Sequence, residues 1–170
     1  MNIRTYHPKP GEASVVLGSA GKWLTYRCEP ELHRVTAYNE FGHVVTSFGG
    51  LGRGLGKLNT PLDLAFVRPE FFGEVLPMAG PDAVWLAVAD YGNRRVQLFE
   101  LDGAYVACIE TDSDMTIGAP CSLAWRAPIL EIEGLEGAHA RVHLTAALLC
   151  GTSEIKPQPR EWLFPNARVN

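Results

Sequence analysis

The feature that most constrains the fold of this chain is a two-residue alternation of apolar and polar side chains in short runs. Side chains of a β-strand point alternately to the two faces of a sheet, so this period predicts strands with a buried face. Turns containing glycine or proline separate the runs, and the period of amphipathic helices is nearly absent. The chain is therefore predicted to be all-β. The predicted strands cover residues 14–18, 22–28, 34–39, 43–49, 62–67, 83–90, 95–100, 104–110, 121–125, 129–134 and 140–146.

The runs recur as two similar rounds, which indicates an internal repeat. The first round contains WLTYRCEPELHRVTAYNEFGHVV (23–45), and the second contains WLAVADYGNRRVQLFELDGAYV (85–106). Aligning the rounds matches Trp23 with Trp85 and, further along, pairs the valines and aromatic residues that follow the turn. This alignment predicts that the turn of the first round holds one extra residue.

A third, weaker round begins where APCSLAW (119–125) matches TPLDLAF (60–66). A repeat of about four short strands forms one sheet, which cannot bury both of its faces alone. Stacking such sheets face to face buries them, as in a β-propeller. The prediction is a partial β-propeller of about three four-stranded blades, the third degenerate. The predicted blades span residues 13–49, 60–110 and 119–150, within a domain of residues 1–150.

Two segments fall outside the predicted strands. Residues 68–82 interrupt the second round, and their prolines and small residues predict a loop. The C-terminal tail, residues 151–170, is also rich in proline but contains EWLF (161–164). These aromatic side chains predict an anchor, either a strand added to a sheet edge or a tail that packs on its own domain.

The second round resembles the NHL repeat. VWLAVADYGNRRVQLFELDGAYV (84–106) has an apolar strand ending in Ala-Asp, a turn with Asn, Arg-Val before an aromatic strand, and a turn with Gly. FGGLGRGLGKLNTPLDLAF (48–66) resembles the linker between two blades of that family. The match is strongest over residues 48–110. The resemblance implies a β-propeller, and family members usually close a ring of about six blades.

Three blades would leave the outer faces of a stack open, and exposed apolar faces are unfavourable. Two half-rings closing as a homodimer would cover them, and we favour this arrangement. Docking onto another partial propeller, a longer parent chain, or a compact three-sheet domain covered by its own tail are the alternatives.

Polar residues in the turn of the second round form the first candidate cluster. Asp and Asn side chains bond nearby backbone N–H groups, and an Arg at a strand start reaches a carboxylate or a turn carbonyl. Asp90, Asn93 and Arg95 have this arrangement, and Glu29 and Arg34 stand at similar places in the first round. Because the pattern recurs from round to round, it favours structural brackets over catalytic groups.

Five glycines between residues 49 and 56 precede Lys57 and form a second candidate. Glycine loops can bind phosphate through converging N–H groups. A P-loop would need Gly at position 51 and Ser or Thr at position 58, where this chain has Leu51 and Leu58. The dinucleotide-binding pattern is also absent. The segment is therefore interpreted as a linker on which Arg53 and Lys57 form a local cationic patch.

The resemblance also raises a metal-dependent alternative. Some propeller enzymes similar to this family, the amidating lyases and the gluconolactonase-like hydrolases, hold a metal ion in the central channel. The predicted innermost strands offer Asp63 and Ser122 but few other polar residues. In a dimer, Asp63 would occur twice around the channel. We therefore expect no metal, no cofactor and no catalytic residue, while this alternative stays open.

Composition limits the compartment and the partners. A net charge of −4 disfavours a nucleic-acid partner, which normally requires a concentrated basic surface. No apolar run approaches the roughly 18 residues needed to span a bilayer, and the first residues lack a secretory pattern, so no membrane partner and a cytoplasmic location are expected. The scattered Cys28, Cys108, Cys121 and Cys150 are then expected to be free thiols.

The predicted function is a non-enzymatic binding scaffold, because rigid propeller frames present variable loops on their rims. The alternatives are a metal-dependent hydrolase or lyase with its ion in the channel, and single-stranded RNA binding, which some NHL relatives show. The predicted binding residues lie on linker ends and turns: His33, Arg34, Arg53, Lys57, Asn59, Thr60, Asp63, Asn93 and Arg94.

Overall fold

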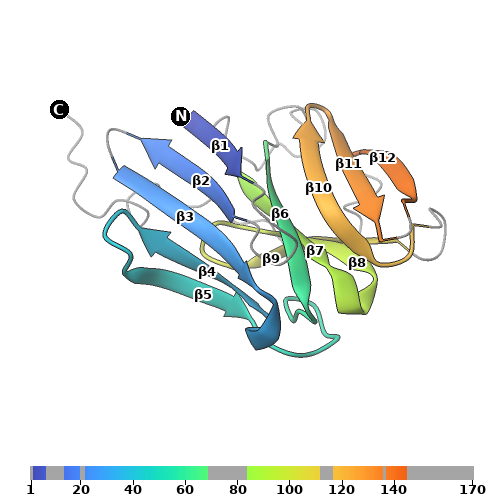
Figure 1. The fold of residues 1–170 in the computed structure, drawn as a ribbon, viewed down its shortest axis with the longest axis horizontal. Coiled ribbons are helices and arrows are strands. Elements are labelled where there is room, and N and C mark those ends of the chain that lie inside the picture. The colour runs from blue at the N-terminus through green and yellow to red at the C-terminus, as the bar shows by residue number, and fades with distance from the viewer. Residues whose placement is uncertain are drawn as a thin grey trace.

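The computed structural model describes residues 2–6, 14–19, 22–68, 84–111, 117–135 and 137–144. These residues form three antiparallel sheets and two single-turn 3₁₀ helices, which confirms the all-β prediction. None of the helices in this part of the chain has the length and apolar character required to cross a membrane. Figure 1 shows the sheets side by side, in chain order from blue to orange.

The three sheets follow one another along the chain. The first has the order β1 (Asn2–Tyr6), β2 (Ser14–Ser19), β3 (Lys22–Glu29), β4 (Arg34–Asn39) and β5 (Val44–Gly49). The second has the order β6 (Pro61–Val67), β7 (Trp85–Asp90), β8 (Arg95–Phe99) and β9 (Tyr105–Glu110). The third has the order β10 (Pro120–Arg126), β11 (Ile129–Gly134) and β12 (His139–His143).

Every predicted strand is present at its predicted place, but the first sheet has five strands instead of the expected four. The additional strand, β1, pairs with β2 from Asn2 opposite Gly18 to Tyr6 opposite Ser14. Backbone pairing along a sheet edge requires no apolar alternation, and the short sequence of β1 shows none. Residues 69–82 of the predicted insertion and the tail 151–170 lie outside the described residues.

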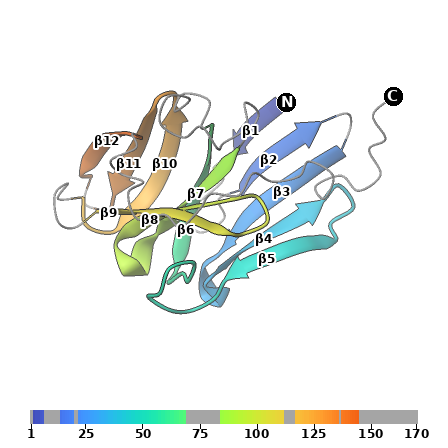
Figure 2. The same cartoon turned by 180° about the vertical axis from the view of Figure 1, so that it is seen from behind.

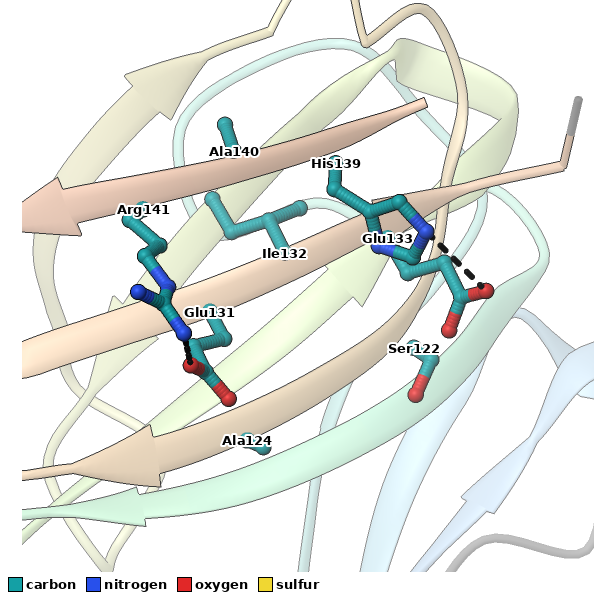
Figure 3. Close-up of a pocket in the computed structure, with 8 residues that line it drawn as sticks. All are labelled: Ser122, Ala124, Glu131, Ile132, Glu133, His139, Ala140 and Arg141. Atoms are coloured by element: carbon teal, nitrogen blue, oxygen red, sulfur yellow. Dashed lines mark ion pairs between the residues drawn. The ribbon is translucent and has the colours of Figure 1, made fainter. Parts of the chain in front are cut away.

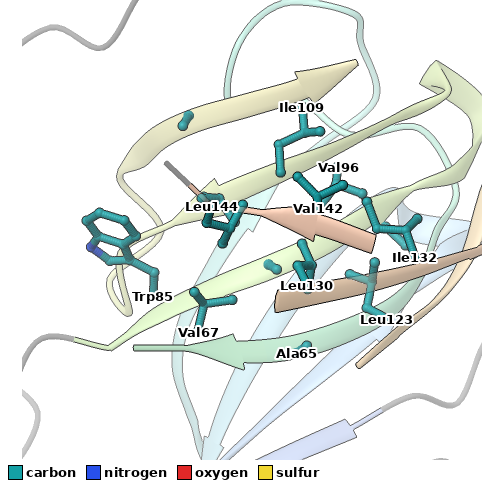
Figure 4. Packing of buried hydrophobic residues seen from close by; sticks show 14 of the residues in the cluster. Ala65, Val67, Trp85, Val96, Ile109, Leu123, Leu130, Ile132, Val142 and Leu144 are labelled. Atoms are coloured by element: carbon teal, nitrogen blue, oxygen red, sulfur yellow. The ribbon is translucent and has the colours of Figure 1, made fainter. Parts of the chain in front are cut away.

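The middle sheet is packed on both faces, and its strands β7 and β8 are entirely buried. One apolar cluster lies between the first and middle sheets, and it contains Tyr26, Phe66 and Phe99. The other lies between the middle and third sheets, where Trp85, Ile109 and Leu130 contribute (Figure 4). Figure 2 shows the same order of sheets from behind. No sheet closes on itself among the residues described, so the propeller stays a prediction.

Tyr26 makes two directional contacts within the first cluster. Tyr26 donates a hydrogen bond of 2.9 Å from its buried hydroxyl to the carbonyl of Leu101, and its ring meets Phe66 edge-on at 5.8 Å. Burial raises the pKa of Tyr26, so the hydroxyl stays protonated and acts as a donor. These contacts fix the first sheet against the middle sheet.

The turns of the first two sheets have the same length, which corrects the sequence alignment. Glu29 pairs with Arg34 across one turn, as Asp90 pairs with Arg95 across the other. Each turn contains a 3₁₀ helix, η1 (Pro30–Leu32) or η3 (Tyr91–Asn93), and ends in a left-handed residue with φ of 53°, at His33 and Arg94 respectively. The predicted extra residue is therefore absent.

The match of Trp23 with Trp85 was wrong by one position. Counting back from the equivalent Glu29 and Asp90 makes Leu24 the equivalent of Trp85. A shift of one residue moves a strand side chain to the opposite face. Trp85 accordingly packs toward the third sheet, whereas the ring of Trp23 lies over Gly18 on the other face.

The face of the first sheet that points away from the middle sheet carries polar side chains on β3, and the ring of Trp23 lies on the same face. Because Tyr26 and its alternate neighbours on β3 point toward the middle sheet, Thr25 and Arg27 point outward. The equivalent positions of the middle sheet hold Leu86 and Val88, which are buried against the first sheet.

Candidate functional site

The predicted binding residues, with one exception, gather at one edge of the stack, which we call the rim. Segments distant in sequence are joined there by backbone hydrogen bonds. Gly50 donates to the carbonyl of His33 at 2.9 Å, and Gly92 donates to the carbonyl of Asn59 at 2.8 Å. The turn after β3, the loop after β5 and the turn after β7 therefore form one continuous surface. The rim comprises residues 30–34, 49–60 and 91–94.

The buried carboxylate of Asp90 is the centre of the rim. It accepts hydrogen bonds from the backbone N–H of Asn59 at 2.7 Å and from the side chain of Asn93 at 2.9 Å. Arg95 Nε lies 2.8 Å from the same group and Gln97 Nε2 lies 3.1 Å from it. Asp90 is fully buried and the Arg95 side chain is 7% exposed, so this ion pair is shielded from water.

The partners of Asp90 hold the glycine-rich loop in turn. Arg95 Nη2 donates to the carbonyls of Gly54 and Lys57, each at 2.9 Å. Gln97 donates to the same Lys57 carbonyl at 2.7 Å and accepts from the N–H of Gly56 at 3.0 Å. Asp90 and Arg95 therefore have a structural role, because their side chains hold the linker between the first two sheets in place.

His33, Asn59 and Thr60 are structural as well. Thr60 has a left-handed backbone with φ of 52°, and its N–H donates to His33 Nδ1 at 3.0 Å. The Thr60 hydroxyl is 3.2 Å from Asn59 Oδ1. Asn93 also donates to the carbonyl of Gly52 at 2.8 Å. These predicted binding residues lie on the rim, where their polar atoms fix the loops.

Cationic and apolar side chains predominate among the exposed residues of the rim. Arg53, Lys57 and Arg94 are exposed, as the interpretation of a cationic patch requires. Sequence reasoning missed the leucines that accompany them. Three leucines lie largely exposed on the same segments, Leu32 at 55%, Leu51 at 67% and Leu55 at 64%. For Leu51 and Leu55 the signal was a leucine between two glycines of the linker, where no strand would bury it.

The bracket of the first sheet is a partly exposed counterpart of Asp90. Glu29 accepts hydrogen bonds from Arg34 at 2.5 Å, Thr36 at 2.9 Å and the Tyr38 hydroxyl at 2.7 Å. Burial raises the pKa of Glu29, but the bonds from Tyr38, Arg34 and Thr36 and the charge of Arg34 outweigh it, so the pKa lies below its ordinary value of 4.5. Arg34, a predicted binding residue, is thus half-exposed and ion-paired.

This lowered pKa gives a pH dependence. Because Glu29 is ionised more readily in the folded chain, its stabilising contribution is complete above 4.5 and is lost as the pH falls through the lowered pKa. The Glu29→Gln variant should therefore melt below the wild type near neutral pH, and the two should converge as the pH falls below 4.5 and through the lowered pKa. Thermal midpoints measured across this range would contradict the assignment if the difference did not change with pH.

Asp63 is the exception among the predicted binding residues, because it is buried within β6 instead of lying at the rim. Its Oδ1 accepts the N–H of Leu64 at 2.8 Å, and its Oδ2 accepts the N–H of Leu123 at 2.7 Å. Leu123 belongs to β10, the edge strand of the next sheet. The predicted rim position was therefore wrong, and Asp63 links the middle and third sheets.

A shallow depression of about 360 Å³ lies on the outer face of the third sheet (Figure 3). Glu131 is paired there with Arg126 at 2.7 Å and with Arg141 at 3.0 Å. The hydrogen bond from Arg126 lowers the pKa of Glu131. The sequence did not predict a depression on this face. Its charged residues alternate with core residues, as they do in any strand with one exposed face. It is lined by Ser122, Ala124, Glu131, Ile132, Glu133, His139, Ala140 and Arg141.

Metal-binding and thiol chemistry were also considered. Within the described residues, no group of three or more His, Cys, Asp or Glu side chains could hold a metal ion. Cys28, Cys108 and Cys121 are free thiols, as predicted, and Cys150 lies outside the described residues. Burial raises the pKa of Cys108 to about 12, with Glu110 adding to the shift, so this thiol is protonated at neutral pH.

Comparison with known proteins does not add a relative to these observations. The chain matches no model of a known protein family, and no curated protein matches it. The resemblance to the NHL repeat therefore stays a prediction carried by its own residues.

Proposed function

We propose that this chain is a non-enzymatic binding scaffold built from NHL-like blades, with the rim as its binding surface. The observation that carries the proposal is that different side chains of the rim hold the loops and face the solvent. The buried polar groups around Asp90 hold the loop backbones, while Arg53, Lys57 and the three leucines are exposed. A rigid frame that presents exposed, chemically mixed side chains is suited to recognition.

The enzymatic alternative required Asp63 to be available to a metal ion. Both carboxylate oxygens of Asp63 accept backbone N–H groups, and the side chain is only 3% exposed. A channel cation would have to displace those bonds. We therefore do not assign Asp63 to a metal site, and the rim remains the better supported surface.

Homodimerisation was expected as a way to cover apolar outer faces. The outward side chains of β3 include Trp23 as well as Thr25 and Arg27, and the outer face of the third sheet carries Glu131 and Arg141. The described part of these faces is therefore mixed in polarity. Ring closure by two copies stays a prediction, and sedimentation equilibrium tests it, since a dimer has twice the mass of the chain.

Selection from a displayed random peptide library tests the binding function without assuming a ligand. The full chain is the bait, and the Arg53→Glu/Lys57→Glu variant is the counter-selection. We expect ligands that bind the wild type and lose about tenfold or more in affinity with this variant. The matched control is Arg126→Glu/Arg141→Glu on the third sheet, which should bind them normally. If every selected ligand were insensitive to the rim variant, the proposed function would be wrong.

A further inference from the structure

We propose that the rim recognises an acidic peptide segment carrying apolar anchor residues. This inference rests on the proposed function and names the chemistry of its partner. Two properties of the rim support this inference: its exposed leucines and its local positive charge. The side chains around Asp90 hold the loop on which most of these residues lie.

The apolar part of the surface is formed by leucines on adjoining segments. Leu32 precedes His33 and Leu51 follows Gly50, and these neighbours are joined by the hydrogen bond between Gly50 N–H and the His33 carbonyl. Leu55 follows Gly54, which is held by Arg95. Single exposed apolar residues are ordinary, but several on adjoining loops mark an interaction surface. A partner with apolar side chains can bury them favourably.

The charge of the rim is opposite to that of the whole chain. Its exposed ionisable side chains are the cations Arg53, Lys57 and Arg94 and the carboxylate of Glu31, so cations outnumber carboxylates there. The chain as a whole carries −4. A partner that meets this patch with carboxylates gains complementary contacts while the rest of the surface repels it, which favours docking at the rim.

The fixed loop geometry supports binding of a short segment. The carbonyls of Gly52, Gly54 and Lys57 are all engaged by side chains of the middle sheet. The loop that carries Leu51, Arg53 and Leu55 is therefore ordered before any partner arrives, and little conformational entropy is lost on binding.

A single-stranded nucleic acid fits the rim less well. Its affinity comes from phosphate neutralisation and from stacking of bases on aromatic rings, and the net charge of −4 opposes a polyanion. The leucines offer no stacking surface. An acidic peptide with apolar residues complements both the charge and the leucines of the rim, whereas RNA complements only the charge.

Fluorescence anisotropy with synthetic probes tests the inference on the full chain. The first probe is a labelled peptide in which Glu alternates with Leu. Three comparison probes have Lys in place of Glu, Ser in place of Leu, or are an oligouridine of equal length. The protein variants are Leu51→Ser/Leu55→Ser and Arg53→Glu/Lys57→Glu. The control variant is Phe41→Ser/Val44→Ser, which removes side chains 76% and 61% exposed on the β4–β5 hairpin. Circular dichroism establishes that each variant is folded.

We expect the Glu-Leu peptide to bind best, to lose about tenfold or more in affinity with each rim variant, and to bind the control variant unchanged. Oligouridine binding as tight as the peptide, or an unchanged affinity of the leucine variant, would overturn the inference. If no probe bound while the displayed library gave rim-dependent ligands of other chemistry, this inference would fail and the binding function would stand. If the library gave no rim-dependent ligand, both would fail.

Discussion

Replacing Asp90 by alanine is expected to lower the free energy of unfolding by about 3–5 kcal/mol, since it removes one partner of a buried ion pair. The Arg95 guanidinium would stay buried without its counter-ion, and the N–H of Asn59 and the amide of Asn93 would lose their acceptor. Urea denaturation of the wild type and the variant measures the change, with an unchanged slope showing that the folded state is comparable.

The matched control for this variant is Glu29→Ala, at the equivalent position of the first sheet. The Glu29 side chain is 19% exposed and that of Arg34 is 42% exposed, so water can replace much of what the carboxylate provides. We expect this variant to lose about 1 kcal/mol. Equal losses for Asp90→Ala and Glu29→Ala would show that the rim does not depend on Asp90.

The second large effect is expected at Asp63. Asp63→Ala should lower the free energy of unfolding by about 3 kcal/mol, because the N–H groups of Leu64 and Leu123 would both lose a charged acceptor. Urea denaturation measures this change as well. Asp63→Asn keeps a single acceptor oxygen and should lose roughly half as much. A neutral Asp63→Ala would contradict the link between the middle and third sheets.

Much of the fold could be predicted because one face of each strand is buried. Alternation places a strand without knowledge of its neighbours, so β4 and β11 were predicted with their observed bounds. The additional strand β1 could not be found in this way. It is joined to β2 by backbone pairing, and its side chains carry no periodic pattern.

The alignment of the two rounds was wrong by one residue in the strand before the turn. It matched two residues of the same type instead of two residues at the same position of the strand pairing. Matching the indole rings of Trp23 and Trp85 required an insertion that the equal turns do not contain. The acid and arginine at the turn ends, Glu29 with Arg34 and Asp90 with Arg95, were the correct guide. Their pairing fixes the register, and the register decides which face each residue occupies.

The candidate site was predicted in its composition but not in its roles. Asp90 and Arg95 were recognised as brackets because their side chains suit turns. Asp63 was misplaced because its acceptor role depends on an N–H of another sheet, Leu123, which no local pattern reveals. The exposure of Leu51 and Leu55 depends likewise on how the loop is held, a property of the assembled rim.

The outward side chains of β3 have a consequence for lengthening the chain. A further four-stranded sheet could be inserted between the middle and third sheets, where both facing surfaces are apolar. A sheet stacked on the outer face of the first sheet would instead bury Thr25 and Arg27, where the middle sheet has Leu86 and Val88 in the same register. Polar side chains on one strand thus oppose extension on that side.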